Sequence, residues 1–469
     1  MQPRDASRPT RPPIEQACYW LARRGPRSLR PALTGRQKAD VAVIGAGLTG
    51  LWTAIRLKEL EPGLEVVVLE RECAAYGASG RNAGILGDSV DHSHGLAISH
   101  FGREEAARLA LLGRANVAEM TGFLAARGID CGLERTGTLH VALREAHLEE
   151  LREDVACARS LGIHDFRLMG AEETRSRLRS PLYVGALLNP SGAILDPVRL
   201  VEGLAAEAER VGVRIFEASP VSAIVDDAQG LLLRSSAGEL LTRRAVQATS
   251  AYSHQLLPWL RHRFIPLYDY VLVSEPLRPE QRKAMGWSGR EGVTDVRTFF
   301  NYYRLTSDNR VLWGTSEAAY FSGNRADASC DHSERHYLEL RESFARHFPD
   351  LGELEWPYAW GGAICATTRM TPFFGSAHGG RLLYGLGFTG HGLGTTHLAG
   401  RILAHLALAR PSPLLDLALV RRPPFPYPPE PARTWAVNAV TRALRRVDAG
   451  RRPSPLLRVL DALGIGLSS

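Results

Sequence analysis

A glycine-rich segment near the N-terminus has the residue types and the spacing of a phosphate-binding turn. It follows the apolar run 41–44, precedes a helical pattern over 51–60, and consists of Gly45, Ala46, Gly47, Leu48, Thr49 and Gly50. Such a turn directs free backbone N–H groups and the positive end of a helix at a pyrophosphate. Gly45 permits the turn, Gly47 lets the phosphates approach, and Gly50 lets helix and strand pack closely. The segment therefore predicts that the chain binds a dinucleotide.

An acidic residue stands where the ribose of such a nucleotide would lie. The apolar run 66–69 is followed by Glu70, 20 residues after Gly50, and then by Arg71. A carboxylate at the end of the second strand of a βαβ unit binds the ribose hydroxyl groups. Glu70 and Arg71 are therefore predicted to contact the cofactor.

A second glycine-rich segment begins at Gly385, 340 residues after Gly45. Five glycines fall within ten residues, and the positions predicted to contact the cofactor are Gly387, Gly390, His391, Gly392 and Gly394. The segment opens a helix predicted over 395–409, whose positive end can stabilise negative charge. A structural left-handed turn is the alternative, although so many glycines destabilise a fold unless something approaches them closely.

The elements expected around these segments place the chain in the α/β class. Helical periodicity is present over 104–128, 146–161, 196–211, 333–348 and 395–409. Strand patterns occupy 137–143, 213–216, 221–225, 231–235, 240–248, 264–275 and 298–315.

A chain of 469 residues is long enough for two structural domains. We expect a discontinuous, Rossmann-like nucleotide-binding domain built from 39–95, 190–262 and 358–412. A substrate domain of α+β character, with a mixed or antiparallel sheet, is expected from 96–189 and 263–357. Residues 1–38 are expected to form an extended leader, and 413–469 a basic, proline-rich and helical tail.

The composition argues against several other classes of protein. Six cysteines are scattered without metal-ligand spacing, which disfavours disulfides and metal sites and favours a reducing, cytoplasmic location. No apolar run approaches the ~20 residues of a membrane-spanning helix, and the N-terminal segment lacks the apolar core of a signal peptide. Most of the formal net charge of +7 lies in 410–469, where ten arginines face four acidic residues. A groove for nucleic acid is not indicated.

Further motifs connect these segments to a known family. They are Gly77–Gly84, Ala248–Tyr252, Tyr303–Thr306 with Asp308, Trp360–Gly362 and Gly387–Gly392. Together with the first turn and Glu70 they resemble, in their order, the D-amino-acid oxidase (DAO) family of FAD-dependent amine and amino-acid oxidoreductases. The resemblance runs from about Tyr19 to Ala409 and is greatest to the gamma-glutamylputrescine oxidoreductase branch.

This resemblance implies FAD as the cofactor and adds residues to its predicted site. Arg81 would pair with the pyrophosphate, and the main chain of Val221 would hold the adenine. The other implied positions are Ser79, Gly80, Asn82, Gly84, Thr249 and Gly362. A nicotinamide dinucleotide is the alternative, but such an enzyme would not need the second glycine-rich segment. We expect noncovalent FAD, because Cys365 stands three residues from Gly362, which matches the flavin-tethering cysteine of sarcosine oxidases.

The resemblance also implies oxidation of the C–N bond of an amine or amino acid by hydride transfer to flavin N5. The resulting imine hydrolyses to an aldehyde or oxo acid. Ala363 and Ile364 stand where amino-acid oxidases of the family carry a carboxylate-binding arginine, so Arg304 and Arg369 become replacement candidates. Leu312 replaces the oxygen-activating lysine of sarcosine oxidases, which brings a quinone or another carrier into consideration beside O2 as the acceptor.

Aromatic residues and a histidine complete the catalytic candidates. Tyr268, Tyr270, Tyr302 and Tyr303 could form a cage for a cationic or apolar amine, although alternation along a strand lets about half of them face the site. His391 would lie beside the flavin, with a turn histidine satisfied by the backbone as the alternative. The residues proposed as catalytic are His391, Arg304, Tyr302 and Tyr268, and no metal ligands are expected.

Alternatives exist for both the activity and the tail. The chain could be a flavoprotein acting on a tRNA- or folate-linked methyl group, or a noncatalytic FAD-binding subunit. One face of a helix predicted in the tail carries Val437, Val440, Leu444 and Val447, opposite Arg442 and Arg446. That helix could dock on its own domain, or lie on an anionic membrane surface where a quinone would be met.

Overall fold

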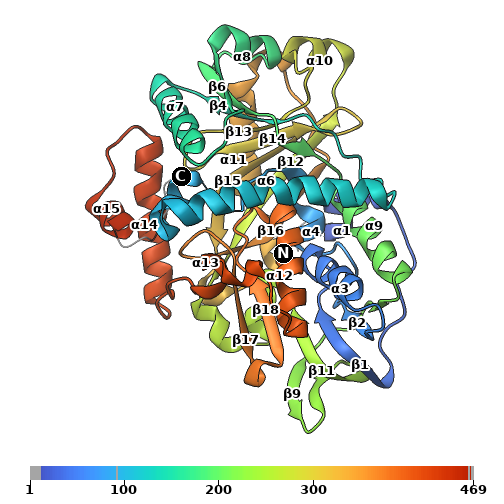
Figure 1. Ribbon diagram of the computed structural model, residues 1–469. Helices are drawn as coiled ribbons and strands as arrows, with labels where there is room; N and C mark the ends of the chain where they lie inside the picture. The colour runs from blue at the N-terminus through green and yellow to red at the C-terminus, as the bar shows by residue number, and fades with distance from the viewer. Residues whose placement is uncertain (1–11, 91–92, 463–464, 466–469) are drawn as a thin grey trace, which may run out of the picture.

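The computed structural model describes residues 12–90, 93–462 and 465. Two eight-stranded sheets organise these residues, one in the lower and one in the upper part of Figure 1, and the long helix α6 (Arg103–Ala126) crosses the middle of that view. The predicted α/β class is confirmed. The parts of the expected leader, first domain and tail that fall in 1–11, 91–92, 463–464 and 466–469 lie outside the described residues.

The first sheet has a parallel centre, with β1 paired to β2 and β11, and β11 paired to β18. Its strands, in pairing order, are β17 (Phe373–Ala377), β18 (Leu382–Leu386), β11 (Gly238–Gln247), β1 (Gly35–Ile44), β2 (Val66–Leu69) and β8 (Arg214–Phe216), with β10 (Gly230–Arg234) and β9 (Ala223–Asp227) attached to β11. Residues 41–44 and 66–69 are buried without alternation, as central parallel strands require.

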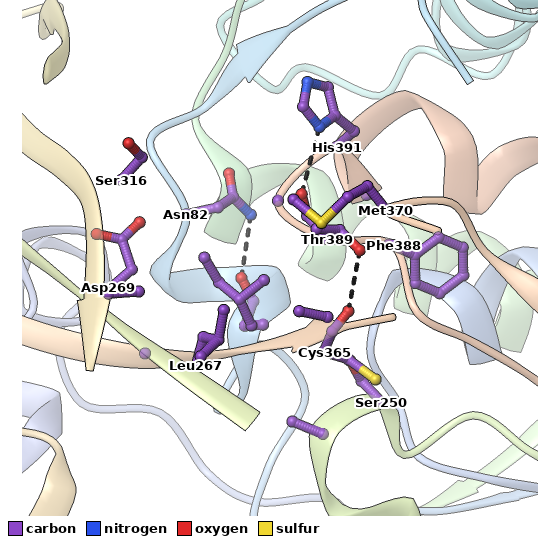
Figure 2. Close-up of a pocket in the computed structure, with 18 of the residues that line it drawn as sticks. Asn82, Ser250, Leu267, Asp269, Ser316, Cys365, Met370, Phe388, Thr389 and His391 are labelled. Carbon is purple, nitrogen blue, oxygen red and sulfur yellow. Dashed lines mark hydrogen bonds between the residues drawn. The ribbon is translucent and has the colours of Figure 1, made fainter. Parts of the chain in front are cut away.

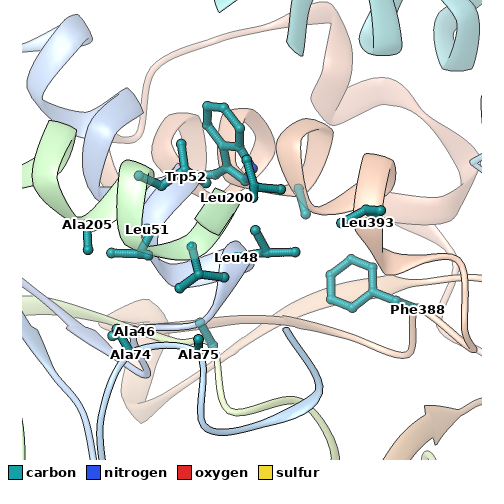
Figure 3. Close-up of a cluster of buried hydrophobic side chains, with 14 of the residues drawn as sticks. Ala46, Leu48, Leu51, Trp52, Ala74, Ala75, Leu200, Ala205, Phe388 and Leu393 are labelled. Carbon is teal, nitrogen blue, oxygen red and sulfur yellow. The ribbon is translucent and has the colours of Figure 1, made fainter. Parts of the chain in front are cut away.

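Three helices pack together beside this sheet: α3 (Leu48–Leu60), α9 (Pro197–Arg210) and α12 (Gly392–Leu408). Figure 3 shows the apolar core that they share, including Leu48, Leu51, Trp52, Leu200 and Leu393. α12 approaches α3 closely, because a Cβ on Gly400 would stand 2.6 Å from the Cβ of Trp52. α9 begins at a side-chain cap, in which Asp196 accepts from the amides of Val198 and Arg199.

The second sheet is antiparallel except for the parallel pair β13 and β4. Its strands, in pairing order, are β16 (Tyr358–Ala366), β12 (Ile265–Pro276), β15 (Arg310–Tyr320), β14 (Asn301–Leu305), β13 (Gly292–Asp295), β4 (Thr138–Ala142), β6 (Gly185–Asn189) and β5 (Arg167–Gly170). Tyr303 and Trp313 stack with ring centroids 4.3 Å apart and pack with Phe344 of α11 (Glu334–His347). The opposite face of the sheet lines the cavity described below.

The chain also forms further helices and two short paired strands. They are α4 (Ala78–Arg81), α5 (His94–Phe101), α7 (Glu145–Ser160), α8 (Ala171–Arg177), α10 (Pro279–Met285), α13 (Ala418–Arg421), β3 (Ile85–Leu86) and β7 (Ala193–Ile194).

Two segments differ from the expected domain plan. The strand β16 was expected in the nucleotide-binding domain, but it pairs along its whole length with β12 of the second sheet. The leader is not wholly extended: its described part forms α1 (Ile14–Ala17) and α2 (Tyr19–Arg24), and Gly35–Lys38 begins β1. Apolar side chains explain the difference, because Tyr19 and Trp20 are buried and hold this segment on the core.

The tail docks on its own chain. α14 (Ala432–Asp448) and α15 (Pro455–Ala462) lie together at the left of Figure 1. Asp448 accepts hydrogen bonds at 2.9 Å from the amides of Thr298 and Phe299, and buried Arg433 donates to Asn324 at 2.7 Å. Within the described residues, every helix is too short or too polar to cross a membrane.

Candidate active site

A cavity of about 1150 Å³ lies between the two sheets and receives residues from both. Most of the predicted cofactor residues line it, although they come from distant segments of the chain. They are Gly45, Gly47, Leu48, Thr49, Glu70, Arg71, Ser79, Arg81, Asn82, Gly84, Val221, Thr249, Gly362, Gly390, His391, Gly392 and Gly394. The fold therefore brings the two glycine-rich segments to one site.

The first glycine-rich turn forms one end of this cavity. α3 begins at Leu48 with Gly47 as its N-cap, so the positive end of the helix lies at the cavity. The Leu48 amide donates to Ser79 Oγ at 3.0 Å, and a Cβ on Gly47 would stand 2.8 Å from that oxygen. Glycine at this position leaves room for a pyrophosphate to approach the backbone.

Glu70 lies beside the turn, at the end of β2. Its carboxylate accepts from the amides of Ala46 at 2.8 Å and Glu72 at 3.0 Å, and burial raises its pKa. The Arg71 guanidinium lies over the ring of Tyr252, 4.9 Å from the centroid. The glycine-rich turn follows β1 and Glu70 follows β2, so both lie at the carboxyl ends of neighbouring parallel strands. This end of the cavity therefore fits the adenosine half of a dinucleotide.

Four predicted cofactor residues do not line the cavity: Ala46, Gly50, Gly80 and Gly387. The three glycines among them instead allow close approaches of the backbone next to it. A Cβ on Gly50 would stand 1.9 Å from the carbonyl oxygen of Gly45. One on Gly80 would stand 2.0 Å from the carbonyl oxygen of Ala75. Gly387 turns the chain with a φ of +90°, where a Cβ would stand 2.5 Å from a methyl group of Thr367.

The guanidinium of Arg81 is committed to another partner than the expected pyrophosphate. It forms a buried ion pair with Asp331 at 3.0 Å, and its Nε donates to the carbonyl of Tyr76 at 2.7 Å. Asp331 in turn accepts, at its main-chain oxygen, the amide of Gly361 at 2.7 Å. Arg81 thus ties the loop after β2 to the second sheet, because burial requires a paired charge.

Strand β12 presents its odd-numbered residues to the cavity. Leu267, Asp269 and Val271 line it, whereas Tyr268 and Tyr270 lie on the other face. The hydroxyl of Tyr268 donates to the carbonyl of Asp327 at 3.3 Å. The prediction of Tyr268 as a catalytic residue is therefore wrong, because side chains alternate along a strand and that of Tyr268 points away from the cavity.

Arg304 also lies outside the cavity, contrary to its prediction as a substrate-binding or catalytic residue. It is buried, donates to the carbonyls of Gly84 at 2.9 Å and Leu195 at 2.6 Å, and lies over the ring of Trp20. Burial lowers its pKa to about 10. Arg369 is likewise occupied, since it donates to the carbonyl of Arg422 at 2.6 Å. Both arginines hold loops together.

Tyr302 does line the cavity, and its partner is a residue that the sequence analysis missed. Its hydroxyl donates to Asp269 Oδ2 at 2.7 Å. The phenol lies across Gly314, where a Cβ would stand 2.5 Å from the hydroxyl oxygen, so glycine there lets the ring reach Asp269. Burial raises the pKa of Asp269 to about 7. The sequence did contain a signal for Asp269, because it is a single acidic residue inside a mostly apolar strand.

Two histidines also line the cavity. His391 follows the turn of Thr389, to whose carbonyl its Nδ1 lies at 3.3 Å, and Figure 2 shows this turn opposite Asp269 and Ser316. His140 of β4 lies 2.9 Å from the Thr294 hydroxyl and also lines the cavity. Burial lowers both pKa values, that of His140 to about 4, so neutral imidazoles line the site near pH 7.

The cavity lining also bears on the two departures noted in the sequence. Cys365 lines the cavity, but burial raises the pKa of its thiol well above the usual range, so it is not a nucleophile near neutral pH. Leu312 is buried in the core, and none of the lysines at 38, 58 and 283, all in the described part of the chain, lines the cavity.

The tail closes the outer side of the same cavity. Tyr427 and the apolar face of α14 line it, through Val437, Val440 and Leu444. Of the two alternatives for this face, the structure has it turned toward the chain's own cavity.

A dinucleotide cradle that opens into a second, half-apolar chamber is typical of flavin-dependent oxidoreductases, in which the protein binds and orients the cofactor against a substrate. Residues 40–406 match the family DAO, described as FAD dependent oxidoreductase. The chain therefore belongs to the DAO family of FAD-dependent oxidoreductases and is an enzyme whose cofactor is FAD.

Individual relatives agree with this assignment. The chain is 30% identical to gamma-glutamylputrescine oxidoreductase of Escherichia coli over 83% of its own length and 88% of that protein. It is 29% identical to the probable oxidoreductase OrdL of Haemophilus influenzae over 81% and 85% of the two chains. Its fold resembles that of glycine oxidase from Geobacillus kaustophilus, with a TM-score of 0.68 and 23% identity over 82% of this chain and 99% of that one.

Proposed function

We propose that this enzyme oxidises the C–N bond of an amine or amino acid by hydride transfer to flavin N5, giving an imine that hydrolyses to an aldehyde or oxo acid. The observation that carries the proposal is one continuous cavity, which joins the glycine-rich cradle to a chamber with the half-buried carboxyl of Asp269 and phenol of Tyr302. An amine is the favoured substrate, because Ala363 and Ile364 line the cavity where a carboxylate-binding arginine was sought. The name of the 30% identical relative, gamma-glutamylputrescine oxidoreductase, agrees with an amine.

The residues present fit FAD, because the cradle has glycine where a Cβ would fill the space over the turn. The Gly47 and Leu48 amides would hold the pyrophosphate, Glu70 the ribose, and the turn at Gly390 the flavin edge. When bound, FAD would act as the acceptor of a hydride, that is, of two electrons and one proton. The chain's own residues orient the substrate, exclude water and carry its protons. We propose noncovalent binding, since the Cys365 thiol stays protonated.

The electron acceptor after the flavin is proposed to be a quinone or another carrier, with O2 as the alternative. Support comes from the lining of the cavity, to which none of the three lysines of the described chain contributes. A reoxidation rate in stopped flow that is far below that of true oxidases is expected. A rate equal to theirs would identify O2 as the acceptor instead.

The proposed location is the cytoplasm. The proposed site of contact with a membrane is the outer face of α14. The six free cysteines suit a reducing compartment. Trp435 is 67% exposed, and Arg442 and Arg446 are exposed on the same face of the helix. Such a face suits an anionic lipid surface. Sedimentation of the full chain with anionic vesicles should depend on Trp435, and equal sedimentation of Trp435→Ala would exclude this contact.

The test of the proposed activity is anaerobic reduction of the holoenzyme. The panel contains n-butylamine, gamma-glutamylputrescine, glycine and D-alanine, and loss of the oxidised flavin absorbance is followed. We expect reduction by at least one amine, and release of the flavin into solution on acid precipitation. Failure of every compound to reduce the flavin would favour a noncatalytic subunit or the tRNA- or folate-linked alternative, and flavin retained in the pellet would overturn noncovalent binding.

A further inference from the structure

Asp269 stands out among the side chains of the substrate chamber because one of its oxygens is unused. Oδ2 accepts from Tyr302 at 2.7 Å, and the backbone amide of Tyr270 also stabilises the ionised carboxyl, whereas Oδ1 is buried with no hydrogen-bond donor in bonding geometry among the described residues. The side chain lies on the cavity face of β12, directly across from Gly362 of β16, which adds no side chain to shield it. A carboxyl oxygen placed in this way is satisfied by a donor that enters the cavity.

The protein supplies no positive charge to this carboxyl. The stem of Arg81 lies against Gly362, where a Cβ would stand 3.7 Å from it, but its guanidinium is paired with Asp331. The other ionisable groups that line the cavity from the second sheet, the turn before α12 and the tail are Tyr302, His140, His391, Cys365, Tyr427, Arg433, and Asp295 with its ion-pair partner Arg297. Arg433 donates to Asn324, and the pKa of Asp269 responds to burial, Tyr302 and the Tyr270 amide and to no charged neighbour. Both histidines are held neutral near pH 7 by burial. Charge balance at Asp269 is therefore left to the ligand.

The walls around the pair restrict the size and polarity of that ligand. Leu267 and Val271 flank Asp269 on its own strand, and Figure 2 shows Ser316 close to it in that view. The apolar face of α14 lines the outer side of the cavity. An ammonium group carried on an alkyl chain satisfies both the carboxyl and these apolar walls.

We infer that Asp269, positioned by Tyr302, receives the protonated amino group of the substrate and accepts one of its protons at Oδ1. This inference rests on the proposed C–N oxidation and specifies an amine as its substrate. The N–H bond breaks, an O–H bond forms on Asp269, and the nitrogen keeps the electron pair. The neutral amine would then be the form able to give up a hydride from its adjacent carbon, for which FAD, when bound, would supply the two-electron acceptor.

A proton acceptor of this kind works while it is ionised. A carboxyl that titrates near neutral pH is well matched to deprotonating a bound amine in the same range. The Tyr302 hydroxyl stabilises the ionised form and so opposes the effect of burial on the pKa of Asp269. Activity should consequently fall on the acid side as Asp269 becomes protonated, and this acid limb should move to higher pH when the phenol is lost.

The experiment compares Asp269→Asn, Tyr302→Phe and the wild-type holoenzyme, with FAD content as the measure of folding. Flavin reduction by n-butylamine and gamma-glutamylputrescine is followed anaerobically across pH. For Asp269→Asn we expect the rate of flavin reduction to fall at least about 100-fold, in the range of general-base catalysis. The acid limb of its pH profile should also be lost. For Tyr302→Phe we expect the acid limb at higher pH, which a merely structural role would not produce.

Binding of butyltrimethylammonium, read as a perturbation of the flavin spectrum at pH 8, separates the inference from the proposed function. Asp269→Asn should weaken this permanent cation at least about tenfold, whereas the uncharged n-butanol should bind both proteins equally. If the wild type is reduced by amines and Asp269→Asn keeps its rate and acid limb, the inference is overturned and the proposed function stands. If no amine reduces the wild type, the proposed function itself fails.

Discussion

The nucleotide cradle and the substrate chamber are two parts of the same cavity, but they are built in different ways. In the cradle, backbone amides and glycines of short continuous segments provide the contacts, as at Gly47 and Gly390. In the chamber, side chains from separate strands meet across the sheet, as Asp269 of β12 meets Tyr302 of β14. Backbone contacts suit a cofactor that is shared by a whole family. Side chains can be exchanged without altering the fold, so they are where a substrate preference can differ.

The largest effect is expected from disturbing the backbone of the cradle. In Gly50→Ala, a new Cβ would stand 1.9 Å from the carbonyl oxygen of Gly45, so the turn must open. We expect a loss of about 3 kcal/mol or more in unfolding free energy, since neither atom can rotate away. FAD content of the purified protein should fall with it. The control Gly63→Ala, where nothing lies within 4 Å, should differ from wild type by less than about 0.5 kcal/mol.

Cradle and chamber are joined by a buried ion pair, and breaking it should have an effect of comparable size. The side chains of Arg81 and Asp331 are 3% and 7% exposed. Asp331→Asn leaves the guanidinium without its charge partner, which costs about 3–5 kcal/mol for a buried pair. Chemical denaturation measures it, with Glu339→Gln as the control, because its pair with Arg335 is exposed and contributes at most ~0.5 kcal/mol. Equal losses in the two variants would show that the clamp contributes nothing special.

Acid should weaken the chamber through His140. Its pKa is lowered from 6.5 in the unfolded chain to about 4 in the fold, so the unfolded chain binds the proton first as the pH falls. The folded state therefore loses stability progressively between pH 6.5 and 4, by up to about 3 kcal/mol at 1.36 kcal/mol per pKa unit. Thermal melts across this range should be steeper in pH for the wild type than for His140→Gln. Parallel curves would mean that His140 is not buried in its neutral form.

The same contrast explains what could be predicted from the sequence. The turn at Gly45 follows from local spacing, because a phosphate-binding turn needs particular residues in a fixed order, whereas the meeting of the two glycine-rich segments in one cavity was implied by the family resemblance. Strand parity does not follow from composition: residues 267–271 carry large side chains on both faces, with tyrosines on one face and Leu267, Asp269 and Val271 on the other, so the sequence alone does not show which face lines the cavity. Arg81 and Arg304 have types that suit ligands, but their buried partners are set by long-range packing.

The smallest effect tests that parity directly. Tyr268 is buried and Tyr302 is half-buried on strands of the second sheet, and Tyr302 alone of the two lines the cavity. Tyr268→Phe removes a hydrogen bond of 3.3 Å to the carbonyl of Asp327, so the expected loss of stability is at most about 1 kcal/mol. Anaerobic reduction by n-butylamine should keep the wild-type rate and pH profile, in contrast to Tyr302→Phe. A Tyr268→Phe variant with a displaced acid limb would mean that the even-numbered face of β12 reaches the substrate, and Asp269 would then face the wrong way to bind it.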